Sequence, residues 1–334
     1  MAVCTRSMMK NKTESTEAKA NNQTYLNLPF DLTLLIMRRL SLKDNVRASV
    51  VCKAWQEACA SVPVEEYPTP WLMHFPFLKE EYELYDPSLD KTHVFESPPE
   101  IRGSHIDCSK DGWLLMHKRS LNFFFNPFTQ ERIVLPWPHD RWGNHARAFS
   151  CAPTSNSCVI LSICDINHNK SIFIQTYHLA TKVCTPLVLP HPFPPKYAGF
   201  DHVVFSNGVF YCLTNIGVLG MFDLATNSWN ALPGPPPNWG LDYYDKFMTE
   251  YQGDIFLIYT YKRKVKQVRY LKLDLTNRKW EEDEKRPKGL TCCLSFKSSL
   301  IVNKDLVHTR KLNQFNWNNV WIKLPINASY LFTS

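Results

Sequence analysis

The chain has 334 residues, of which 44% are hydrophobic, and a formal net charge of +7. This length and composition fit a globular protein with one small and one large domain, and no apolar run approaches the roughly 20 residues that span a bilayer. Residues 1–62 carry 9 basic and 5 acidic side chains, whereas residues 63–334 carry 29 and 26. Because the larger part lacks a one-sided basic excess, we expect neither a nucleic acid nor a membrane as partner.

Residues 1–24 are polar and lack the apolar core of a secretory signal. We expect them to form a disordered tail, and we expect a cytoplasmic or nuclear protein. Eleven cysteines are scattered without regular spacing. Without an export signal, most of them are expected to be buried, reduced thiols. We predict no metal site and no cofactor.

Residues 25–62 have apolar side chains at helical spacing. One side of a first helix is formed by Leu28, Leu32, Leu35, Ile36 and Leu40. Ser41 and Asp44 resemble a capping box that begins another helix, and Pro63 ends the apolar pattern. The segment therefore predicts two or three packed helices. A unit below roughly 40 residues generally needs disulfides, a metal or a partner for stability. Spacing alone is equally compatible with an appendage packed on the following domain.

The order of residues in this segment resembles the F-box. The pattern comprises Leu28-Pro29-x-Asp31-Leu32, then Ile36 and Leu40, and finally Val51-Cys52-Lys53-x-Trp55. F-box proteins are the substrate-receiving subunits of cullin-RING ubiquitin ligases of the SCF type. The resemblance implies a Skp-type adaptor as partner, and through it a cullin-RING ligase. It also implies that the adaptor surface is made or shaped by Leu28, Pro29, Leu32, Ile36, Leu40, Val51, Cys52 and Trp55.

After a predicted linker over residues 63–70, short alternating strands replace the helical pattern. A sequence pattern recurs in which an apolar strand ends in Asp, Asn or His and is followed by a Thr-centred turn and another short strand. We call this Asp, Asn or His the polar anchor of the repeat. The polar anchors lie 40, 52, 45 and 51 residues apart, at Asp86, Asn126, His178, Asp223 and Asp274. A repeat of about 40–50 residues with four strands is typical of a β-propeller blade. We predict a propeller over residues 71–334, with six blades near 71–98, 103–136, 146–190, 200–233, 246–284 and 290–325.

The first of these blades has no predicted first strand, and we expect residues 326–334 to supply it and close the ring. This half of the chain resembles kelch-like propellers, particularly the C-terminal domain of plant F-box proteins. The resemblance rests on residues 108–114 (Cys-Ser-Lys-Asp-Gly-Trp-Leu) and on Asn126-Pro127-Phe128-Thr129. The double glycine of standard kelch repeats is absent. The predicted fold class is therefore multidomain, a three-helix F-box followed by an all-β, kelch-like propeller.

The connections between blades emerge on one face of an up-and-down propeller. Three of them, residues 136–145, 190–200 and 233–245, are rich in Trp, Tyr and Arg, which are enriched in interface hot spots. We predict that a target protein binds there through Trp137, Arg141, Trp142, Phe193, Tyr197, Trp239, Tyr243 and Tyr244. The alternative is that these aromatic side chains pack inward between the blades.

Together these patterns predict a non-catalytic receptor that holds a target protein for ubiquitination, so that its contribution is proximity. The sequence contains no Gly-x-Ser-x-Gly, His-Glu-x-x-His or phosphate-binding glycine loop. A buried cluster of Asp, Arg or His in the central channel would favour an enzyme instead. A propeller-based lectin or small-ligand sensor coupled to the same adaptor is a third hypothesis, because Trp and Tyr loops also stack on sugars and apolar ligands.

Overall fold

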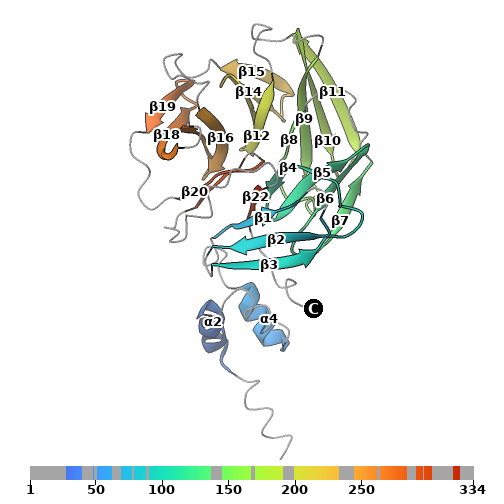
Figure 1. Ribbon diagram of the computed structural model, residues 1–334, viewed down its shortest axis with the longest axis vertical. Coiled ribbons are helices and arrows are strands. Elements are labelled where there is room, and N and C mark those ends of the chain that lie inside the picture. The colour runs from blue at the N-terminus through green and yellow to red at the C-terminus, as the bar shows by residue number, and fades with distance from the viewer. Residues whose placement is uncertain are drawn as a thin grey trace, which may run out of the picture. The chain divides into compact units, whose positions relative to one another are not determined.

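The chain divides into two compact units, one comprising residues 1–67 with 326–334 and the other Pro68–Pro325. The computed structural model describes residues 28–39, 48, 51–61, 69–76, 79–87, 90–136, 145–166, 170–190, 199–232, 244–261, 264–283, 291–295, 297–302 and 319–323. The helices of the first unit are blue in Figure 1, and the strands of the second run from cyan to red. The predicted tail over residues 1–24 lies outside the described residues.

The described part of the second unit contains five four-stranded antiparallel sheets. The first contains β22 (Asn319–Ile322), β1 (Trp71–His74), β2 (Glu81–Asp86) and β3 (Lys91–Glu96). The second contains β4 (His105–Lys110), β5 (Trp113–Lys118), β6 (Leu121–Phe125) and β7 (Arg132–Leu135). The third contains β8 (Ala146–Phe149), β9 (Val159–Ile166), β10 (Ser171–His178) and β11 (Val183–Pro190).

The two remaining four-stranded sheets follow the same order along the chain. One contains β12 (Phe200–Ser206), β13 (Val209–Thr214), β14 (Leu219–Asp223) and β15 (Ser228–Leu232). The other contains β16 (Tyr244–Tyr251), β17 (Asp254–Tyr261), β18 (Lys264–Asp274) and β19 (Lys279–Asp283). A two-stranded sheet of β20 (Thr291–Cys293) and β21 (Leu300–Val302) lies where the sixth blade is predicted.

These sheets are arranged around a common centre, with β4, β8, β12, β16 and β22 nearest to it (Figure 1). Every residue of the inner strand β8 is buried, whereas the outer strand β11 is largely exposed. Strands in each complete sheet follow one another from the centre outward, which is the up-and-down order of propeller blades. The predicted β-propeller is therefore confirmed. Five complete blades are described, and the count of six stays a prediction.

The strand that closes the ring is not the one predicted. β22 pairs antiparallel with β1, from Trp71 opposite Ile322 to His74 opposite Asn319. The predictions that residues 326–334 close the ring and that the sixth blade extends over residues 290–325 were therefore wrong, because residues 319–322 belong to the first sheet. The physical reason is burial, because Val320, Trp321 and Ile322 are fully buried and suit an innermost strand covered by neighbouring blades. An outermost strand such as β3 instead leaves alternate side chains exposed.

The polar anchors of the repeat stabilise tight turns between the third and fourth strands. Asp223 Oδ1 accepts hydrogen bonds from the backbone N–H groups of Ala225 and Thr226, at 2.8 and 3.0 Å. Asn126 Oδ1 accepts equivalent bonds from residues 128 and 129, and Asp274 Oδ1 from residues 276 and 277. Hydrogen bonds from the turn lower the pKa of both aspartates below its usual range. Asp and Asn side chains commonly stabilise turns in this way, by bonding to backbone N–H groups two and three residues ahead.

Gly220 on β14 lies directly beneath the indole of Trp229 on β15. A Cβ atom at position 220 would lie 2.0 Å from Trp229 Cη2, which no real contact allows. We expect Gly220→Ala to lower the free energy of unfolding by about 1–3 kcal/mol, because the indole has to move out of its packed position. Urea denaturation of the full chain measures this. In a Trp229→Leu background the same change should cost much less, and an equal cost in both backgrounds would contradict the explanation.

Candidate functional site

The helical unit contains two described helices, α2 (Phe30–Arg39) and α4 (Lys53–Ala60). α2 begins after Pro29, whose carbonyl oxygen accepts hydrogen bonds from the N–H groups of Leu32 and Thr33, both at 3.0 Å. Proline suits this position because its missing N–H would be unpaired there, and Asp31 in the first turn favours the positive end of the helix dipole. At the start of α4, the N–H of Gln56 donates to the Cys52 carbonyl at 3.0 Å.

A small core holds these two helices together. Met37 on α2 and Ala58 on α4 are fully buried, and Leu34, Ala48 and Trp55 pack against them. Among the described side chains, each helix contributes one fully buried hydrophobic group to this core. Much of the remaining apolar surface of α2 therefore faces away from this core.

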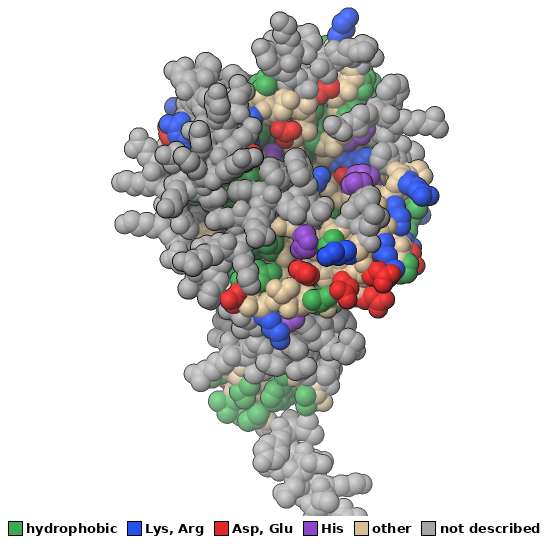
Figure 2. All heavy atoms as spheres, in the orientation of Figure 1, with side chains coloured by type: hydrophobic (Ala, Val, Ile, Leu, Met, Phe, Trp, Pro, Cys, Tyr) green, Lys and Arg blue, Asp and Glu red, His purple; other side chains and the backbone are tan. Residues whose placement is uncertain are grey.

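Among the described residues of the helical unit, four large hydrophobic side chains are exposed to solvent. Their exposed fractions are 45% for Phe30, 51% for Leu32, 49% for Leu35 and 57% for Val51. We call these four residues the exposed apolar set, and Figure 2 shows hydrophobic side chains in green on the described part of this unit. Exposed apolar side chains that gather on one small unit mark a site for a protein partner.

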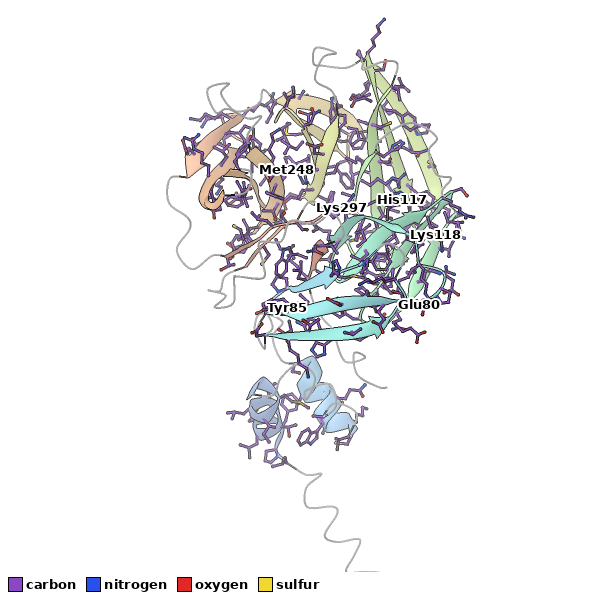
Figure 3. The ribbon with its side chains drawn as sticks, viewed as in Figure 1. Glu80, Tyr85, His117, Lys118, Met248 and Lys297 are labelled. Atoms are coloured by element: carbon purple, nitrogen blue, oxygen red, sulfur yellow. The ribbon has the colours of Figure 1, made fainter. Side chains whose placement is uncertain are left out.

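The β unit has a cavity of about 80 Å³ at its centre. It is lined from β4, β8, β12, β16 and β21 and from residues beside them, including Lys110, His202, Met248, Glu250 and Lys323. Met248 and nearby Lys297 come from different blades and lie toward the middle of the ring (Figure 3). Burial lowers the pKa of His202 to about 4, so its imidazole is neutral, and Nε2 donates to the Lys246 carbonyl at 2.8 Å.

Hydroxyl groups around this cavity connect neighbouring blades. Ser109 Oγ donates to the Trp321 carbonyl at 2.5 Å, and Ser298 Oγ donates to the Ser109 carbonyl at 3.1 Å. Thr249 Oγ1 donates to the Ser299 carbonyl at 2.7 Å. An innermost strand has no further strand on its central side to pair with its backbone carbonyls. These hydroxyl groups donate to carbonyls there and so take the place of a neighbouring strand.

A buried charged cluster joins the second and third blades. Asp107 Oδ2 lies 2.9 Å from Arg147 Nη1, and Asp107 Oδ1 accepts a hydrogen bond from His117 Nδ1 at 2.9 Å. Arg147 Nη1 also donates to Asn122 Oδ1 at 3.2 Å. His117 is labelled in Figure 3. Burial alone would raise the pKa of Asp107, but the hydrogen bond from His117 and the charge of Arg147 hold it below its usual range.

This cluster is of the type that would favour an enzyme, but its geometry fits a structural role. Both carboxylate oxygens of Asp107 are occupied by partners from the protein itself, and the side chains of Asp107 and Arg147 are only 8% and 2% exposed. Across the described residues, no three His, Cys, Asp or Glu side chains are grouped so that they could hold a metal ion.

Comparison with known proteins shows the family. Residues 25–67 match the F-box domain model, and residues 84–304 match the model of the KIB1-4 beta-propeller. The chain is a plant F-box protein with a C-terminal KIB1-4 β-propeller. It is 44% identical to the F-box protein At3g56470 of Arabidopsis thaliana, over 92% of this chain and 91% of that protein. It is 41% identical to the F-box/kelch-repeat protein At1g57790 of the same plant, over 80% of this chain and 75% of that protein.

Membership of this family gives the general role. An F-box domain implies binding of a Skp1-type adaptor in an SCF complex, with the role of a substrate adaptor. F-box proteins are generally non-catalytic parts of the ligase. Within the described ranges, no helix has the length and hydropathy needed to cross a membrane.

The structure places most of the residues predicted to bind the adaptor. Pro29, Leu32 and Val51 are exposed, and Leu28, Ile36 and Cys52 are partly exposed. Trp55 packs on the core of the helical unit, so it shapes this F-box from within, and Leu40 lies outside the described residues. Phe30 and Leu35 were missed as candidates. Leu35 is one of the apolar residues that the spacing places along one side of the first helix, so the sequence contained a signal for it. For Phe30, the spacing does not show whether the side chain is exposed or lies in the core.

The predicted substrate-binding residues cannot be placed in the same way. Trp137, Arg141, Trp142, Phe193, Tyr197, Trp239 and Tyr243 lie outside the described residues, and Tyr244 begins β16 without a described side chain. Strand direction does fix the face from which their segments start. The chain enters β1 at Trp71 and leaves β22 at Ile322. Both residues lie on the face where the first and second strands of each blade are joined. The predicted binding segments start from the other face, where one blade connects to the next. Substrate binding by these residues stays a prediction.

Proposed function

We propose that this protein is the substrate-recognition subunit of an SCF-type cullin-RING ubiquitin ligase. Its exposed apolar set binds the Skp-type adaptor, together with Leu28, Pro29, Ile36 and Cys52, and Trp55 supports that surface from the core. The connections between the propeller blades bind a target protein. The single observation that carries the proposal is the exposure of Leu32, Leu35 and Val51 within the segment that matches the F-box.

The energetics favour a covered state for this surface. Burying one Leu or Val side chain contributes about 1.5–3 kcal/mol, so three such groups supply several kcal/mol of binding free energy. The receptor itself adds no chemical step. It raises the effective concentration of the target's lysines near the conjugating enzyme that the ligase recruits. Such a role places the protein in the cytoplasm, the nucleus or both.

Reconstitution with purified components tests the adaptor half of the proposal. The full chain should co-purify with a Skp-type adaptor and a cullin, and a chain lacking residues 25–62 should not. Stable folding of the adaptor alone and of the shortened chain has to be verified by circular dichroism. Equal recovery of the adaptor with both chains would refute the assignment.

The target-binding half predicts a separation of functions. Trp239→Ala combined with Tyr243→Ala should reduce capture of target proteins at least tenfold, because aromatic hot-spot residues each contribute about 2 kcal/mol or more. Adaptor binding should not change. Quantitative mass spectrometry of proteins bound to the full chain measures the first effect, and co-purification measures the second. Leu275→Ala, at an exposed turn of the opposite face, is the control. Parallel loss of both activities would indicate misfolding and not a binding face.

One observation favours a second candidate, a small-ligand sensor coupled to the same adaptor. The central cavity of about 80 Å³ has the opposite charges of Lys110 and Glu250 in its wall. A screen of small polar metabolites and glycans by thermal shift tests this function. A ligand that raises the melting temperature of the full chain, with the effect lost in Lys110→Met, would support it.

A further inference from the structure

Two cysteines flank the connection between β8 and β9 at the inner edge of the third blade. The strands pair in register from Ala146 opposite Ile163 to Phe149 opposite Ile160, and the N–H of Ser150 donates to the Val159 carbonyl at 2.9 Å. Continuing this register places Cys151 opposite Cys158. Residues directly opposite each other in antiparallel strands have Cα atoms about 4.5–5.5 Å apart. This separation lies within the range that a disulfide requires.

The Cys158 thiol lies against the backbone of Cys151. Cys158 Sγ donates a hydrogen bond to the Cys151 carbonyl at 3.2 Å, and Cys151 Sγ lies 3.6 Å from Ser157 Oγ, next to Cys158 in the chain. Both cysteines are reduced in this structure. The fold therefore brings the two cysteines side by side.

The connection itself is stabilised by its own hydrogen bonds. The N–H of Ser155 donates to the Ala152 carbonyl at 2.9 Å, and the N–H of Cys158 donates to the Ser155 carbonyl at 3.2 Å. Ser150 Oγ accepts from the N–H of Val159 at 2.9 Å. These bonds fix both ends of the connection, so the backbone holds the two cysteines in this opposite arrangement.

Exposure distinguishes the two sulfur atoms. Cys151 is partly exposed and can meet a dissolved oxidant, whereas Cys158 is buried. Burial raises the pKa of Cys158 to about 12, and the nearby Cys151 and Asp111 act in the same direction. Because Cys151 is the more exposed of the two, oxidation begins there, and Cys158 is the partner that resolves it.

We propose that Cys151 and Cys158 are a redox-modification site that a hydroperoxide converts to an intramolecular disulfide. In the first step the Cys151 sulfur attacks the peroxide O–O bond, a sulfenic acid forms, and water or an alcohol leaves. In the second step the Cys158 sulfur attacks the sulfenic sulfur, the S–S bond forms, and water leaves. The two thiol hydrogens and the peroxide are consumed together, and a dithiol reductant reverses the change.

The bridge has a defined structural consequence. Ala148 and Phe149, just before the connection, line the central cavity, as does Asp111 near Cys158. The disulfide joins the ends of this connection and limits its motion beside the cavity. It should raise the melting temperature of the full chain by several degrees, about 5 °C, because cross-linking restricts the unfolded chain.

Mass spectrometry of the folded full chain tests the proposal. Hydrogen peroxide should make the tryptic peptide over residues 148–170 lighter by two hydrogen atoms, and dithiothreitol should restore its mass. This peptide also contains Cys164, which is buried in β9 and serves as the matched control. Cys164→Ser should still form the disulfide, whereas Cys151→Ser and Cys158→Ser should each abolish it and the rise in melting temperature.

Three outcomes would overturn the proposal. The first is an oxidised peptide in Cys151→Ser that still lacks two hydrogens. The second is direct addition of oxygen at Cys151 of the wild type without loss of two hydrogens. The third is equal disulfide formation in native and urea-unfolded protein, which would show that the fold does not select this pair. Circular dichroism of each variant verifies folding, and Cys151→Ser is the decisive variant because its site is partly exposed.

Discussion

Leu32→Ala combined with Val51→Ala is expected to weaken adaptor binding at least tenfold. Each side chain is about half exposed in the free protein and would be buried in the complex. Fully burying one such group contributes about 1.5–3 kcal/mol, and half of that burial remains to be gained, so losing both groups removes about 1.5–3 kcal/mol of binding free energy. Every 1.4 kcal/mol corresponds to a factor of ten. Because neither side chain is buried in the free chain, the stability of the helical unit should change by no more than about 0.5 kcal/mol. Isothermal titration calorimetry with purified adaptor measures the affinity.

The chain offers a matched control for this experiment. Val183 and Val188 on β11 are 51% and 56% exposed, which closely matches Leu32 and Val51, but they belong to the outer strand of a propeller blade. Val183→Ala combined with Val188→Ala should leave the affinity for the adaptor unchanged. If both double variants bind the adaptor as tightly as the wild type, the exposed apolar set serves another purpose.

Asp107→Asn is expected to lower the free energy of unfolding of the propeller by about 3–5 kcal/mol. The substitution removes the negative charge that faces Arg147 in a buried ion pair. For a unit of this size, such a loss lowers the melting temperature by about 10 °C. Asp254→Asn is the matched control, because its partner Lys272 lies 2.5 Å away in a pair that is nearly half exposed. That variant should change stability by less than about 1 kcal/mol.

The same carboxylate gives a pH dependence with a definite sign. The pKa of Asp107 is lower in the folded protein than its ordinary value of 3.8. Its contribution is therefore fully present above that value and is lost as the pH falls through the lower folded pKa. Melting curves between about pH 6 and pH 3 should show a steeper decline for the wild type than for Asp107→Asn. Parallel declines would show that Asp107 does not titrate in this way.

Most of the correct predictions rest on patterns formed by residues close together in the sequence. The turn anchors Asn126, Asp223 and Asp274 bond to backbone groups two and three residues ahead, so the sequence contains both partners of each interaction. The spacing of apolar residues around Leu32 likewise predicts a helix, because helical geometry depends on residues three and four positions apart. The repeat length then predicted a propeller, because four short strands per repeat have few other arrangements.

The candidate adaptor site was predicted in part. Leu32 and Val51 are exposed as the F-box resemblance implies, whereas Trp55 packs against Met37 and Ala58 and supports the surface from inside. Spacing could not separate these roles, because apolar residues on both sides of a short helix have the same pattern. Which side is covered depends on where the second helix packs.

The sequence by itself determined a helical F-box followed by a propeller of repeated four-stranded units, since both depend on residues close together in the chain. Only the tertiary structure decided which strand closes the ring, that Asp107 meets Arg147 between two blades, and that Trp321 lies in the innermost layer. His74 and Asn319 are 245 residues apart, yet their side chains hydrogen-bond at 2.7 Å. Such pairings depend on burial and on the register between distant strands. Neither can be derived from the spacing of residues that are neighbours in the sequence.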